Sequence, residues 1–77
     1  MKVKDYRGYE INVTRERSLG GDMLLYYQVV RNSDGWFALD SFEDSDHTVR
    51  ELVGHMKARI DAELEEDDPW GYAADGW

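Results

Sequence analysis

The sequence predicts an α+β fold: a three-stranded antiparallel β-meander with one C-terminal helix packed on one face (βββα). Two patterns support this prediction. Three apolar segments of strand length are separated by glycine-containing turns, and a longer segment then repeats its apolar residues at helical spacing. We expect one βββα domain over residues 1–68 and an irregular, Trp-containing C-terminal tail over residues 69–77.

The first predicted strand covers residues 9–16, where Tyr9, Ile11 and Val13 alternate with polar residues. This period of two is typical of a strand that buries one of its faces. Residues 2–6 are an open alternative, because they could add a short edge strand with Arg7 and Gly8 as the following turn.

Glycines mark the two turns of the meander. Gly20 and Gly21 permit the positive φ angles that hairpin loops demand, and the pair Asp34-Gly35 is a strong hairpin signal. Between these turns, residues 23–31 are apolar on both faces, as expected of a central strand. The third strand then covers residues 36–42.

The predicted helix covers residues 48–66. Thr48 and Glu51 match a capping box, in which each side chain bonds a backbone N–H that the first turn leaves unpaired. Gly54 inside the helix costs about 1 kcal/mol relative to alanine. The apolar residues follow the spacing of one helical face: Val49, Leu52, Val53, Met56, Ile60 and Leu64.

This apolar stripe should pack on one face of the sheet. We expect it to meet alternate residues of the second strand together with Tyr9, Ile11, Val13, Phe37 and Leu39. One helix covers one face only, so the other face should expose some of the aromatic residues Tyr26, Tyr27, Trp36 and Phe42. A partner protein or a second copy of the chain could cover that face.

Length and composition bound what the chain can do. A chain of 9.0 kDa buries only about 60% of its surface on folding, which leaves little room for a buried cofactor, and we expect none. The absence of cysteine excludes disulfides and thiolate metal sites. No apolar run suits a signal peptide or a membrane span, so we expect a cytoplasmic protein with no membrane partner.

The formal charge of −8 is unevenly placed. Residues 1–33 contain six basic and four acidic side chains, whereas residues 34–77 contain three basic and 13 acidic ones. This argues against direct binding of nucleic acid, because phosphate contacts need clustered Lys and Arg.

No catalytic or metal-binding motif stands out. His55 falls on the polar side of the helix, where we interpret it as a solvated side chain, and no serine has a visible base partner. The acids around Asp44 lack the pattern of a calcium-binding loop, and Gly20-Gly21 lacks the lysine of a phosphate loop. An enzyme is therefore the third interpretation, behind two kinds of protein-binding module.

The acidic residues form one block before the helix and one at its far end. One interpretation is an ordinary solvated face that aids solubility. The other is a mimic of nucleic-acid phosphates that occupies a basic groove of another protein, with aromatic residues as anchors. For that second case we predict these partner-binding residues: Asp40, Glu43, Asp44, Asp46, Asp61, Glu65, Asp68, Trp36 and Trp70.

In its size, acid blocks, lack of cysteine and compact sheet with one helix, the chain resembles, as a class, the small acidic anti-CRISPR proteins of phages. That resemblance implies a non-enzymatic inhibitor of a bacterial nucleic-acid-binding protein, a candidate CRISPR effector subunit, in some members by DNA mimicry. A second resemblance, to HicB-type antitoxins, rests on the βββα unit with an Asp-Gly hairpin and on the helix opening at residues 46–52. It implies a toxin-binding or structural interaction module, with a homodimer as one form.

Overall fold

The computed structural model describes residues 1–44 and 47–71 and shows four strands and one helix within them. The elements are β1 (Lys2–Tyr6), β2 (Tyr9–Arg17), β3 (Met23–Arg31), β4 (Phe37–Asp44) and α1 (Val49–Leu64). The strands form one antiparallel sheet in the order β1-β2-β3-β4. The α+β class and the C-terminal helix are confirmed, whereas the predicted number of three strands is wrong.

The additional strand is β1, the segment that the sequence left open. It contains only Val3 and Tyr6 as partly buried apolar residues, which is too few for a clear period of two. Pairing holds it in place instead, with Val3 opposite Ile11 and the terminal amine of Met1 donating a 2.6 Å hydrogen bond to the carbonyl of Val13.

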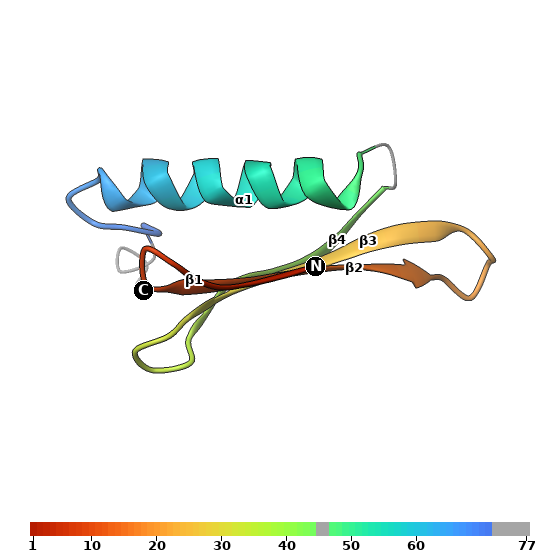
Figure 1. Cartoon of the computed structure of the whole chain (residues 1–77), viewed down its shortest axis with the longest axis horizontal. Coiled ribbons are helices and arrows are strands. Elements are labelled where there is room, and N and C mark those ends of the chain that lie inside the picture. The colour runs from red at the N-terminus through yellow and green to blue at the C-terminus, as the bar shows by residue number, and fades with distance from the viewer. Residues whose placement is uncertain (45–46, 72–77) are drawn as a thin grey trace.

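The helix lies along one face of the sheet, and no described element covers the opposite face (Figure 1). The expected contacts between the helix stripe and the first two long strands are confirmed. The fully packed residues come from β2, β3 and α1: Tyr9, Ile11, Val13, Leu25, Val29, Leu52, Val53, Met56 and Ile60.

Phe37 does not face the helix, and that prediction is wrong. The pairing of β3 with β4 shifts between Val29, which lies opposite Leu39, and Val30, which lies opposite Phe37. This bulge places one extra residue, Ala38, in β4. Phe37 and Leu39 therefore point to opposite faces, and Phe37 is 51% exposed on the face without a helix.

The capping box at the start of α1 is confirmed. The backbone N–H of Glu51 donates to the Thr48 hydroxyl at 3.0 Å, and the Thr48 N–H donates to the Glu51 carboxylate at 2.8 Å. The bond from the Thr48 N–H is the largest cause of the lowered pKa of the Glu51 carboxylate. Within the described ranges, no helix combines the length and the apolar character needed to cross a membrane.

Candidate protein-interaction surfaces

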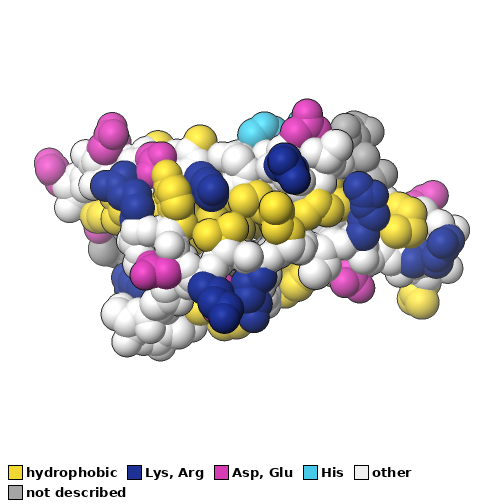
Figure 2. Space-filling model, viewed as in Figure 1, with side chains coloured by type: hydrophobic (Ala, Val, Ile, Leu, Met, Phe, Trp, Pro, Cys, Tyr) yellow, Lys and Arg dark blue, Asp and Glu magenta, His cyan; other side chains and the backbone are white. Residues whose placement is uncertain are grey.

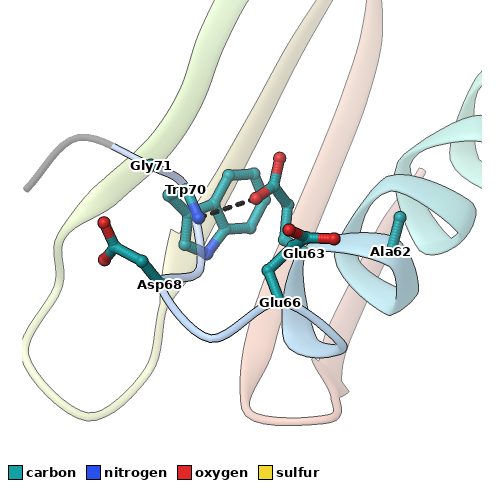
Figure 3. Close-up of a pocket in the computed structure, with 6 residues that line it drawn as sticks. All are labelled: Ala62, Glu63, Glu66, Asp68, Trp70 and Gly71. Carbon is teal, nitrogen blue, oxygen red and sulfur yellow. Dashed lines mark hydrogen bonds between the residues drawn. The ribbon is translucent and has the colours of Figure 1, made fainter. Parts of the chain in front are cut away.

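Trp70, a predicted partner-binding residue, packs on the protein's own core. Its indole Nε1 donates a 3.0 Å hydrogen bond to the hydroxyl of Tyr9, and the two rings lie 5.8 Å apart. Its backbone N–H donates a 2.7 Å bond to the carboxylate of Glu63 (Figure 3). The guanidinium of Arg59 lies 5.4 Å from the indole centroid. Trp70 thus closes the end of the core where α1 stops.

This docking holds Trp70 in an unusual backbone conformation. Its φ of 68° is in the left-handed region, which costs roughly 1–2 kcal/mol for a residue with a Cβ. The bonds to Tyr9 and Glu63 offset that cost. The chain therefore leaves the helix in one fixed direction.

Trp36, the second predicted aromatic anchor, joins the same cluster. Its ring lies 6.2 Å from that of Trp70 in an edge-on arrangement, and the Arg31 guanidinium lies 4.9 Å from its centroid. Arg31 also donates two hydrogen bonds, of 3.0 and 2.7 Å, to the carboxylate of Asp34. These bonds and the N–H of Trp36 lower the pKa of Asp34 to about 2. The turn between β3 and β4 is therefore tied to the helix exit.

Asp61, a predicted partner-binding acid, is used inside the fold. Its carboxylate accepts hydrogen bonds of 2.9 Å from the Tyr6 hydroxyl and from Arg7. The bond from Arg7, followed by that from Tyr6, lowers the pKa of Asp61, and the same carboxylate raises the pKa of Tyr6. Asp61 thus connects α1 to the turn between β1 and β2, and its charge is matched by Arg7.

The four acidic residues that follow the helix differ from Asp61 in having no ion-pair partner among the described residues. We call this segment the acidic tip: Glu65, Glu66, Asp67 and Asp68. All four are exposed, and none forms an ion pair within the part of the chain that the structure describes. The last turn of α1 contains no basic residue, so the partial negative charge of the helix end adds to theirs. Of the predicted site residues, Glu65 and Asp68 belong to this tip.

An open depression of about 320 Å³ lies beside the tip. Glu66 and Asp68 stand at its rim and Trp70 lies at its inner side (Figure 3). Glu63 also lines it, but the bonds from Arg59 and from the Trp70 N–H lower the pKa of Glu63 and hold its carboxylate in place. Figure 2 shows acidic side chains at the end of the molecule where α1 stops, and Lys and Arg side chains spread along the face in view.

The predicted first acid block is not gathered with the tip. Asp40 is exposed on β4 and accepts a 2.6 Å bond from the Tyr26 hydroxyl, which raises the pKa of Tyr26. Glu43 points to the helix side of β4, where its carboxylate lies 3.8 Å from His47. Asp44 ends β4, and nothing is described of its side chain. Asp46 lies outside the described residues, as do Tyr72 and Trp77 of the tail.

Two histidines meet at the start of the helix. The rings of His47 and His55 lie 4.9 Å apart in an edge-on arrangement, and His55 is exposed, as its place on the helical wheel predicts. Among the described residues, no three His, Cys, Asp or Glu side chains are arranged to hold a metal ion.

The face of the sheet opposite α1 displays an apolar patch that sequence reasoning identified only in part. Tyr26 and Phe42 were expected there and lie there, with ring centroids 4.9 Å apart. Tyr27 instead packs against the core. The register also places Leu24, Val30 and Phe37 on this face. The apolar run on both faces of the central strand could have indicated that Leu24 and Val30 lie on this face. The position of Phe37 depends on the bulge in β4, which no local pattern marks.

In comparisons with known proteins, no protein-family model, curated protein or solved structure matches the chain.

Proposed function

We propose that the chain is a non-enzymatic inhibitor that binds a basic, nucleic-acid-binding surface of a bacterial defence protein, with a CRISPR effector subunit as the candidate target. The observation that supports this proposal is the acidic tip. Four consecutive exposed carboxylates at a helix C-terminus form a compact negative field, which attracts a surface built to bind phosphates.

The contacts that hold the acidic tip against the core favour a role in binding a partner over a role in solubility alone. Trp70 and Trp36 hold the chain against the core directly beside the tip, so its backbone is ordered before a partner arrives. Binding then costs less conformational entropy than binding by a free acidic tail. We assign no part of the contact to Asp61 and Glu63, since Arg7 and Arg59 already pair with their carboxylates.

DNA binding by a purified CRISPR effector complex, measured by gel shift with increasing amounts of the chain, tests this proposal. We expect the chain to displace DNA from the effector complex. This inhibition should weaken as salt is added. The variant Glu66→Gln/Asp67→Asn should weaken inhibition by about tenfold.

The matched control removes two exposed acids from the opposite end of the molecule, Glu16→Gln/Asp22→Asn, with the same change in net charge (Figure 1). It should inhibit like the unmodified chain. If both variants lost the same amount of inhibition, or if inhibition did not depend on salt, the assignment of the acidic tip as the binding surface would be contradicted.

A further inference from the structure

The edge strand β4 has a free side. The strand order places β4 at one end of the sheet, where β3 pairs with it on one side only. In an antiparallel pair, alternate residues point their N–H and C=O groups away from the partner strand. Within the described residues, no backbone or side-chain group forms a hydrogen bond to that outer side. These groups are a template for another strand.

The opposite edge of the sheet is a poorer template. β1 has five residues against eight in β4, and its pairing with β2 is irregular between Val3 and Tyr6. β4 is therefore the edge on which an added strand finds the longer row of unpaired groups.

The composition of β4 indicates which partner fits. Its eight residues include Asp40, Glu43 and Asp44 and no basic residue. Opposite charges on neighbouring strands stabilise the pairing, and like charges oppose it. An acidic segment is disfavoured on this edge for the same reason, and so is β4 of a second copy.

We propose that β4 accepts an extended, basic segment of a partner protein as a fifth strand. Side chains of neighbouring strands that lie opposite each other share a face of the sheet, and the period is two. The segment therefore places Lys or Arg beside Asp40 and, two residues away on the same face, an apolar side chain beside Phe42. Phe42 is 56% exposed and leaves that position open. The site is separate from the acidic tip.

The probe is a short synthetic peptide, added to the full chain, in which lysine and valine alternate at every second position with threonine between them. One face of the extended peptide then presents Lys and Val two residues apart, as the pair Asp40 and Phe42 requires. Amide hydrogen exchange and amide chemical shifts, both followed by NMR, report where it binds. We expect the outward amides of β4 to exchange more slowly when the peptide is present, since they gain hydrogen bonds. Asp40→Asn should weaken binding about 1.5- to 5-fold, the size of one cross-strand charge pair, while Asp22→Asn in the turn after β2 should not.

Two control peptides separate strand addition from simple charge attraction. One carries an N-methyl group on every backbone amide, which keeps the lysines and removes the donors from both edges of the peptide; the other replaces lysine with glutamate. Neither should protect β4. If the N-methylated peptide binds equally well and the shifts map to residues 65–68, the edge proposal is overturned while the acidic tip stands. Association of the chain with itself through β1 and β4, seen as a rising mass in sedimentation without peptide, also overturns it.

Discussion

The indole N–H of Trp70 donates a hydrogen bond to the hydroxyl of Tyr9 across 61 positions of sequence. Tyr9 is the first residue of β2 and is almost fully buried, with 5% of its surface exposed. Through this bond, the segment that follows the helix becomes part of the core. The contact holds the chain that follows α1 against the core and presents the acidic tip in one orientation.

We predict that Trp70→Ala lowers the free energy of unfolding by about 2–4 kcal/mol, somewhat less than a fully buried tryptophan would. Tyr9→Phe keeps the ring and removes the hydroxyl, so it should cost about 1 kcal/mol. Urea unfolding followed by circular dichroism measures both. Leu19→Ala, in the exposed turn after β2, is the control and should change stability by less than about 0.5 kcal/mol. A Trp70→Ala variant as stable as this control would contradict the docked position of Trp70.

The sequence predicted the parts of the fold that depend on local pattern. The alternation at Tyr9, Ile11 and Val13, the turns at Gly20-Gly21 and Asp34-Gly35, and the capping box of Thr48 all occur as expected. Each of these signals lies within a few residues of the structure that it specifies. They fix the helix, the long strands and which face of β2 is buried.

What the sequence did not predict depends on pairing between distant residues. The bulge that turns Phe37 outward is decided by how β4 aligns with β3, and nothing in the residues around Ala38 marks it. The role of Asp61 depends on its meeting Arg7, 54 positions away. An acidic residue on a helix therefore appears available to a partner until the fold shows which basic side chain neutralises it.

Asp61 and Asp68 should respond differently to charge reversal. Asp61→Lys places a cation beside Arg7 and removes the acceptor of the Tyr6 hydroxyl, so it should destabilise the fold. Asp68→Lys lies in the exposed tip and should leave stability unchanged. Thermal unfolding of both variants distinguishes them, and equal unfolding temperatures would contradict the structural role of Asp61.

Protonation of Asp34 should lower the free energy of unfolding at acid pH. Its pKa of about 2 in the folded chain lies below the value of about 3.9 for an unfolded aspartate, so the unfolded chain takes up the proton first. The stabilisation by Arg31 and the Trp36 N–H is therefore complete above the unfolded pKa and is lost as pH falls through the folded one. Asp34→Asn should flatten the profile of stability between about pH 4 and pH 2, whereas Ser33→Ala should not. An unchanged slope in the Asn variant would contradict this linkage.

The capping box should account for a measurable part of helix stability. Thr48→Ala removes the acceptor of the Glu51 N–H and should lower the free energy of unfolding by about 1 kcal/mol. Thr48→Ser retains the hydroxyl and should cost much less. Urea unfolding of the two variants tests this, and similar losses would show that the Thr48 methyl group matters more than its hydrogen bond.

Gly54 offers the opposite change, a substitution that should stabilise the protein. It lies within α1, it is exposed, and a Cβ built on it meets no atom within 4 Å. Its φ is not in the positive range, so alanine fits the backbone without strain. Gly54→Ala restricts the unfolded chain and should raise the free energy of unfolding by about 1 kcal/mol. Gly35→Ala is the matched control, because the φ of +76° at Gly35 makes alanine unfavourable there and should lower stability. If Gly54→Ala were instead destabilising, the exposed side of the helix at that position would have to contact another part of the protein.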